Sequence, residues 1–276
     1  MNNLKLKAWE LRLSVLDIVA AGKCGHIGGD MSVIDALTVI YDRMNITPER
    51  ADDPDRDRFV LSKGHCVEAL YAVLSDKGFL NLEDILRTYS KFGSEYIGHP
   101  HNTLPGIEMC SGSLGHGLGV SVGMALAGKR DGRNYRVYTV MGDGELAEGS
   151  VWEAAMAASQ YGLDNLTALI DRNRLQISGT TEYVMHQDDA GERFSSFGWN
   201  VISVSDGNDT NQLSSAFDEA ERVKGKPTMI IANTVKGCGS PVMENKASWH
   251  HHVPTDEEYE LIRKDLLKRI EEIRHE

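Results

Sequence analysis

A carboxylate and an amide side chain lie thirty residues apart in the sequence, each directly after a predicted strand. Asp143, in a Gly-Asp-Gly run, follows the apolar run 135–141, and Asn173 follows a second apolar run, 166–170. The residues between them predict a helix over 148–160. Two parallel strands joined by a helical crossover would bring both side chains to the same carboxyl edge of a sheet.

This arrangement predicts a site for a divalent metal ion and a diphosphate group. Mg²⁺ prefers octahedral coordination by oxygen, so one carboxylate and one amide oxygen suit it, with phosphate, carbonyl and water as further ligands. Gly142 and Gly144 let a bulky diphosphate approach the backbone beside a helix N-terminus, which favours anions. A Gly-Asp-Gly run alone is also a common turn between a strand and a helix. Asn173 favours the binding site, because one arrangement then explains both features.

Together with five further motifs, the run from Gly142 to Asn173 resembles the thiamine diphosphate signature of transketolases. The motifs follow the order of that family, cover about residues 20 to 254, and resemble the N-terminal half of its members. They are Gly25-His26-Ile27-Gly28-Gly29-Asp30, Leu61-Ser62-Lys63-Gly64-His65, Gly98-His99-Pro100, Gly112-Ser113-Leu114-Gly115-His116-Gly117, and Val235-Lys236-Gly237 with Trp249-His250.

The order of predicted elements indicates an α/β fold, with a mostly parallel sheet and helices on both faces. Further predicted helices span residues 4–21, from the cap Ser32 to 43, 65–77, within 81–92, 120–129, 210–223 and 255–275, and further strands span 59–61, 200–204 and 227–234. Residues 174–190 read as a polar loop, and Thr255 with Glu258 predicts a capping box. The resemblance implies the diphosphate-binding (PP) domain of the thiamine-diphosphate-binding fold over 1–254, with 255–276 as a C-terminal helix packed on it.

The resemblance also implies roles for individual residues. Four histidines would line the funnel to the reactive carbon of the cofactor and act in catalysis: His26, His65, His99 and His250. Mg²⁺, or Ca²⁺ or Mn²⁺ in its place, would be held by Asp143, Asn173 and the carbonyl of Leu175. Contacts to thiamine diphosphate are expected from His65, Gly112, Leu114, Gly142, Asp143, Gly144, Glu148, Asn173, Lys236 and His250.

Other positions receive weaker interpretations. Lys63 is expected near the diphosphate or the substrate, and Glu148 at an interface between halves. His251 and His252 follow His250 directly; since consecutive side chains point in different directions, we interpret them as incidental to the site.

Part of the family's active site is absent from this sequence. In transketolases, the glutamate that contacts the pyrimidine ring of the cofactor and the arginines that grip the sugar phosphate belong to a C-terminal part, whereas this chain ends at Glu276. The resemblance therefore implies the N-terminal subunit of a two-subunit transketolase, paired in an α2β2 assembly with a separately encoded C-terminal subunit. Such an enzyme would move a two-carbon ketol unit from a ketose phosphate to an aldose phosphate.

Composition excludes some other classes of protein. The formal net charge of −12 argues against a nucleic-acid partner, which would require a basic stripe. No apolar run approaches the length of a membrane span. The four cysteines show no CxxC spacing and no signal peptide precedes them, which predicts reduced thiols and a cytoplasmic protein.

Three alternatives remain open from the sequence. The α-subunit of a 2-oxo acid dehydrogenase shares the Asp143 and Asn173 pattern, but the motifs at 61–65 and 249–250 point away from it, as they do from a 1-deoxyxylulose-5-phosphate synthase fragment. A non-catalytic cofactor-binding or regulatory subunit is the third alternative. It gives no reason for the chain to keep Asp143, Asn173 and the histidines.

Overall fold

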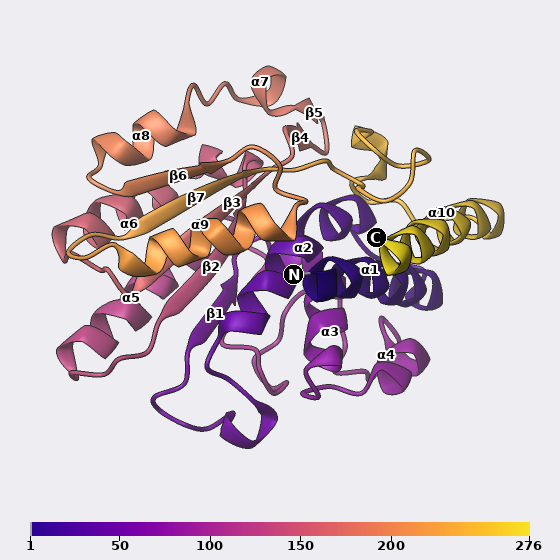
Figure 1. The fold of residues 1–276 in the computed structure, drawn as a ribbon, viewed down its shortest axis with the longest axis horizontal. Helices are drawn as coiled ribbons and strands as arrows, with labels where there is room; N and C mark the ends of the chain where they lie inside the picture. Colours follow the sequence, from indigo (N-terminus) through magenta and orange to yellow (C-terminus); the bar gives the residue numbers. More distant parts are fainter. Residues whose placement is uncertain (1) are drawn as a thin grey trace.

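A five-stranded parallel sheet forms the centre of the protein, in a computed structural model that describes residues 2–276. The strand order is β1-β2-β3-β7-β6, and every neighbouring pair is parallel (Figure 1). The strands are β1 (Arg58–Leu61), β2 (Val137–Gly142), β3 (Leu166–Arg172), β6 (Asn200–Val204) and β7 (Thr228–Asn233). The predicted α/β fold with a mostly parallel sheet is therefore confirmed.

Helices cover both faces of this sheet, as predicted. Alternate side chains of each strand point to opposite faces, so Tyr138 and Val140 of β2 belong to one hydrophobic core and Val137 and Met141 to another. The first core contains helices α1 (Asn2–Gly22), α2 (Ile27–Arg43), α3 (Val67–Asp76) and α9 (Thr210–Arg222). The second contains α5 (His116–Arg130), α6 (Gly149–Gln160) and α8 (Ala190–Ser196).

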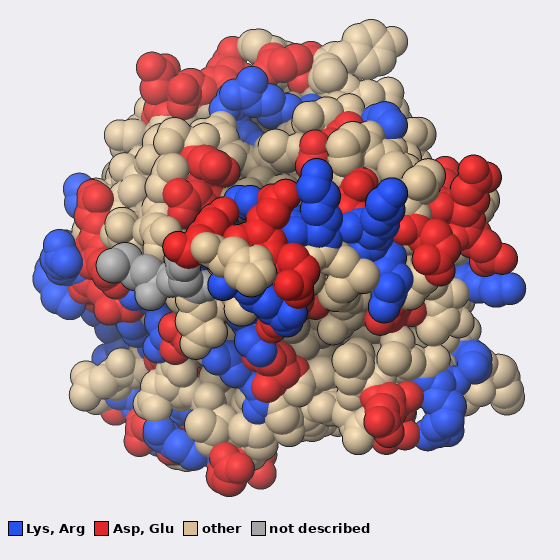
Figure 2. All heavy atoms as spheres, turned by 45° about the vertical axis from the view of Figure 1, so that its right-hand side comes forward, with Lys and Arg blue, Asp and Glu red and all other residues tan. Residues whose placement is uncertain are grey.

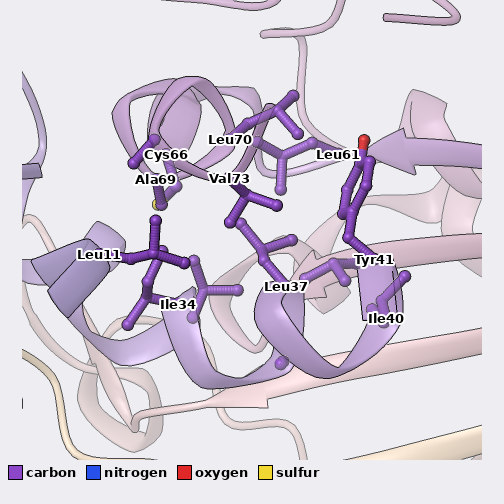
Figure 3. Packing of buried hydrophobic residues seen from close by; sticks show 14 of the residues in the cluster. Leu11, Ile34, Leu37, Ile40, Tyr41, Leu61, Cys66, Ala69, Leu70 and Val73 are labelled. Carbon is purple, nitrogen blue, oxygen red and sulfur yellow. The ribbon is translucent and has the colours of Figure 1, made fainter. Parts of the chain in front are cut away.

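The first core holds α2 in place. All of its residues from Ile27 to Tyr41 are buried. Figure 3 shows Ile34 and Leu37 of α2 packed toward Val73 of α3, with Leu61 at the end of β1 beside them. This packing fixes the first turn of α2, which begins directly after His26.

Helix α2 begins at Ile27, so the prediction that it starts after a cap at Ser32 is wrong. Because glycine is unfavourable inside a helix, Gly28 and Gly29 argue in the sequence against a helix that begins here. Close packing nevertheless requires both glycines. A Cβ on Gly28 would lie 2.6 Å from the carbonyl oxygen of Trp249, and one on Gly29 would lie 2.7 Å from the sulfur of Cys66. The Ser32 hydroxyl donates to the Asp171 carboxylate instead of capping the helix.

Helix α4 (Leu82–Thr88) lies within the predicted range 81–92 and is capped by Asn81, and Tyr89, which follows it, is buried. Two further boundaries differ from the predictions. Helix α5 begins within the glycine-rich run, after Gly115 at φ +85°. The predicted polar loop contains β4 (Leu175–Gln176), β5 (Gly179–Thr180) and α7 (Thr181–Val184), and the unpredicted α8 follows it. Asp189 caps α8 by accepting from the backbone of Glu192 at 3.0 Å, so this carboxylate has a structural role.

The C-terminal helix α10 (Asp256–His275) packs along α1, and its predicted capping box at Thr255 and Glu258 is confirmed. Ile262 and Leu266 are buried, and Tyr259 donates to Asp17 at 2.7 Å. On this side of the molecule acidic and basic side chains are interspersed and form no basic stripe (Figure 2). None of the helices in residues 2–276 combines the length and apolarity needed to cross a membrane.

Candidate active site

A cavity of about 340 Å³ lies where the strands of the sheet end. Lys63 follows β1, Asp143 follows β2, Asn173 follows β3 and Lys236 follows β7, and all four line the cavity. Parallel strands deliver the residues that follow them to one edge of a sheet, which is where ligands bind in such folds. Register fixes this convergence, because Gly142 pairs with Asp171 across β2 and β3.

Nearly all of the predicted site residues meet in this cavity. It is lined by the predicted residues His26, His65, His99, Gly112, Leu114, Gly142, Asp143, Gly144, Asn173, Leu175, Lys236 and His250. The exception is Glu148, which is exposed and lies before the first residue of α6. Its side chain lies against Gly115, where a Cβ would approach the Cβ of Glu148 to 2.6 Å. The individual roles of these residues remain proposals.

Asp143 and Asn173 lie side by side, as predicted. The Asp143 carboxylate accepts from the backbone N–H groups of Gly144, at 2.9 Å, and Arg174. The Asn173 amide oxygen accepts from the backbone N–H of Leu175 at 3.1 Å. Residues 2–276 contain no cluster of three or more His, Cys, Asp or Glu side chains that could hold a metal. A cation here would need the amide and carbonyl oxygens as well as the single carboxylate, and Mg²⁺ accepts such a set.

Two buried lysines give the cavity its positive charge, and they differ in their partners. Lys63 forms an ion pair with the buried Asp171 carboxylate. Burial alone would lower the pKa of Lys63, but the charge of Asp171 raises it instead. Lys236 forms no ion pair within residues 2–276 and contacts Nδ1 of His250 at 3.1 Å. Burial, and then the charge of Lys63, lower the pKa of Lys236.

The residues present fit a diphosphate with a divalent cation. Lys236 is 1% exposed and forms no ion pair among the described residues. Burial, and then the charge of Asp171, raise the pKa of Asp143 to about 6, and Asp143 forms no ion pair within residues 2–276. Buried charges without partners are costly, and an anion beside Lys236 with a cation beside Asp143 would offset both costs. Gln176 also lines the cavity, and its buried Oε1 has no hydrogen-bond partner within residues 2–276.

The four predicted histidines form a cluster on one side of the cavity. The ring centroid of His26 lies 5.1 Å from that of His65, 6.2 Å from that of His99 and 5.6 Å from that of His250. Burial lowers the pKa of all four rings, to about 4 for His26 and about 3 for His250, and nearby positive charges add to the effect for His26, His65 and His250. At neutral pH each ring is therefore uncharged and offers one donor and one acceptor, which suits hydroxyl groups.

Sequence reasoning missed two residues near this cluster. The ring of His251, interpreted as incidental, lies 4.6 Å from that of His26, whereas His252 faces away and packs on Trp249. Glu145 is buried and accepts from the backbone N–H groups of Gly115, at 2.7 Å, and Gly142, at 3.1 Å. Its place directly after the Gly-Asp-Gly run was the available signal for Glu145, and the run of three histidines was the signal for His251.

Comparison with known proteins identifies the family. Residues 5–269 match the family described as transketolase, thiamine diphosphate binding domain. The chain is 47% identical to one of the subunits of the apulose-4-phosphate transketolase of Phocaeicola vulgatus, covering 100% of this chain and 98% of the relative. It is 39% identical to 6-deoxy-6-sulfo-D-fructose transketolase subunit SqwG of a Clostridium species, covering 96% and 97%.

Solved structures agree with this match. A transketolase mutant from Pichia stipitis superposes with a TM-score of 0.90 at 32% identity, over 96% of this chain but only 41% of the yeast chain. This chain thus spans less than half the length of the single-chain transketolase that it resembles. It belongs to the transketolase family and corresponds to the N-terminal, thiamine diphosphate binding part of its members.

Proposed function

We propose that this chain is the N-terminal subunit of a two-subunit transketolase that uses thiamine diphosphate and Mg²⁺. The observation that carries the proposal is the convergence of four histidines, Asp143 and Asn173 on one cavity. The reaction would transfer a two-carbon ketol unit from a ketose phosphate to an aldose phosphate. The relatives that match over nearly their whole length are named transketolase subunits, which supports this activity over that of a 2-oxo acid dehydrogenase.

Each group of residues in the cavity would have a separate task. Asp143, Asn173 and the Leu175 carbonyl would hold the metal ion, and Lys236 would bind the diphosphate. Gly112 and Leu114 would offer backbone contacts to the aminopyrimidine ring. Thiamine diphosphate supplies, when bound, a nucleophilic carbon whose charge its own ring stabilises.

The histidines would act on the sugar. Neutral imidazoles can orient hydroxyl groups and hold or accept a proton at an oxygen that develops charge. His26, His65 and His250 lie within ring contact of one another and His99 lies beside His26, so they could bind neighbouring hydroxyls of one donor. We propose all four as substrate-contacting residues.

The C-terminal partner would cover an apolar rim beside the cavity. Ile177 is 71% exposed, Tyr183 83% and Met185 57%, and all three belong to the segment that follows Asn173. Ile177 and the half-exposed Val184 also line the cavity. Exposed apolar groups around a site favour a protein partner. We propose an α2β2 assembly, with each active site between one α and one β chain, and we place it in the cytoplasm, where its unpaired cysteines remain reduced.

The relatives' names guide the choice of substrate. One acts on apulose 4-phosphate and another on 6-deoxy-6-sulfo-D-fructose. We propose the branched sugar phosphate first, because that relative has the higher identity, then the sulfonated sugar, and then xylulose 5-phosphate.

Native mass spectrometry of the tagged chain, purified from its source with thiamine diphosphate and Mg²⁺, tests the proposal. We expect a heterotetramer that carries cofactor and a second chain, and turnover with at least one of the three donors. A homo-oligomer without cofactor, or an intact heterotetramer inactive toward a wide panel of ketose phosphates, would contradict the proposed function.

A further inference from the structure

Two carboxyl groups contact each other in the protein interior, behind His26 and outside the residues that line the cavity. Asp30 lies in the first turn of α2 and Glu68 in the first turn of α3, and both are fully buried. Their side chains lie within hydrogen-bonding reach of each other. The proposed reaction gives neither of them a task.

Hydrogen bonds to neighbouring groups satisfy all but two of the carboxyl oxygen atoms of the pair. One oxygen of Asp30 accepts from the backbone N–H of Ala69 at 3.0 Å, and one oxygen of Glu68 accepts from the hydroxyl of Tyr89. The second oxygen of each carboxyl group has no hydrogen-bond partner in the described part of the chain. A buried acceptor without a partner costs about 1–3 kcal/mol in general. One proton between the two groups satisfies both oxygens.

The surroundings favour a singly protonated pair. Burial raises the pKa of Glu68 to about 7, and burial together with the charge of Glu68 raises that of Asp30. Two carboxylates in contact cannot both remain charged. Among the described residues, the other titratable groups that face the pair are Tyr71, Tyr89, Cys66 and Lys63, and the charge of Lys63 is already matched by Asp171.

Glu68 also touches the backbone that carries His26. Gly25 has φ +145°, and a Cβ there would lie 2.5 Å from Oε1 of Glu68. The polar backbone at His26 lies close enough to favour the charged form of Glu68. Nδ1 of the His26 ring has no partner in the described part of the chain, and the side chain does not cap α2. Backbone packing therefore sets the direction of this imidazole.

We propose that Asp30 and Glu68 share one proton and together position His26, by holding the backbone at 25–26 against the start of α3. The effect on catalysis rests on the proposed function, in which His26 contacts the sugar. The shared proton itself does not rest on it, and it can be measured on the chain alone.

The sign of the pH effect follows from the direction of the shifts. Both pKa values are raised in the folded state, so the stability that the pair contributes is fully present below the unfolded value of 4.5. It is lost as the pH rises through the folded value of about 7. We expect the thermal midpoint of the wild-type chain to fall between pH 5 and pH 8.

The decisive variant is Glu68→Gln, because the amide carries a permanent N–H toward Asp30 and keeps an acceptor for Tyr89. Its charge equals that of the singly protonated pair. We expect its thermal midpoint to change less than that of the wild type between pH 5 and pH 8. Glu83→Gln, at an exposed carboxylate in α4, is the matched control and should follow the wild type.

Turnover of the assembled complex measures the positioning role. Glu68→Gln should keep kcat within about twofold, whereas Glu68→Ala should lower kcat by about tenfold, because small displacements of a catalytic group are costly. A wild-type kcat in Glu68→Ala would overturn the positioning role. Parallel pH curves for wild type and Glu68→Gln would overturn the shared proton.

Two further outcomes keep the test decisive. If Glu68→Ala does not fold, Asp30→Asn is measured in its place, beside Glu68→Gln. A kcat close to that of the wild type in both amide variants supports the proposal, and a lower kcat in both contradicts it. If the wild-type complex shows no turnover with any ketose phosphate, the proposed function fails, while the melting curves still decide whether the pair shares a proton.

Discussion

Two buried charged clusters in this molecule differ in how completely their charges are paired. In the first, Arg12 bonds Asp35 at 3.1 Å, the carbonyl of Cys238 at 3.1 Å and that of Met31 at 3.2 Å, and Asn208 donates to Asp35 at 2.8 Å. In the second, at the cavity, Lys236 and Asp143 form no ion pair within residues 2–276. The first cluster joins α1 to α2 and is complete within the chain. We propose that a ligand completes the second by supplying the opposite charges.

This difference separates groups that hold the fold from groups that we propose are reserved for binding. When a buried ion pair has all its hydrogen bonds, removal of either partner destabilises the fold, because the remaining charge is buried without a partner. A buried charge without a partner already destabilises the chain, so its removal costs binding and not folding. Four substitutions test this contrast.

The largest effect is expected for Asp35→Ala. The change leaves the Arg12 guanidinium buried without its carboxylate, and such losses cost about 3–5 kcal/mol. Urea unfolding of the chain measures it. The double variant Arg12→Met with Asp35→Leu should regain most of the loss, since apolar replacements of similar volume are often neutral. If Asp35→Ala lowers the free energy of unfolding by less than about 1 kcal/mol, the cluster of Arg12 and Asp35 does not hold the fold.

Asp143→Ala should show the opposite pattern. We expect turnover of the complex to fall by more than about 100-fold, since even residues that only support a metal ligand can cost that much. The chain itself should become more stable at pH 8, because the raised pKa of Asp143 means that its charge costs folding energy above about pH 6. The gain should shrink at pH 5. Asp131→Ala, at an exposed carboxylate, serves as the control; destabilisation at both pH values would contradict the binding role.

The stabilisation of the complex by bound cofactor should depend on Lys236. At ten times the dissociation constant, bound thiamine diphosphate with Mg²⁺ should stabilise the complex by about 1.4 kcal/mol. Lys236→Met should remove most of this rise in thermal midpoint, and Lys224→Met, at an exposed lysine, should leave it unchanged. An equal rise in both variants would mean that Lys236 does not bind the diphosphate.

The smallest effect is expected for His251→Ala. Its ring touches that of His26 at the edge of the histidine cluster, so its loss should raise KM for the sugar about threefold and leave kcat unchanged, as for uniform binding. His252→Ala is the matched control, because His252 bonds Glu258 at 3.0 Å and packs on Trp249. Steady-state kinetics with one donor compare the two, and equal KM values would return His251 to an incidental role.

Much of this molecule could be predicted from its sequence, because strand ends and glycine-rich turns leave local signals. The positions of Asp143 and Asn173 after two neighbouring strands follow from apolar runs and short polar motifs. Helix α8 could not be predicted, since its signal is only the cap Asp189 within a polar segment. The contact between His26 and His251 joins distant segments, and the packing of Trp249 on Gly28 helps to bring them together.

The uncovered apolar rim has a consequence for how the protein must be made. Ile177, Tyr183 and Met185 project from the short segment after β3, and any copy synthesised without a partner presents them to solvent. Such copies adhere to one another or to chaperones as their concentration grows. We therefore expect co-expression with the proposed partner subunit to raise the yield of usable protein.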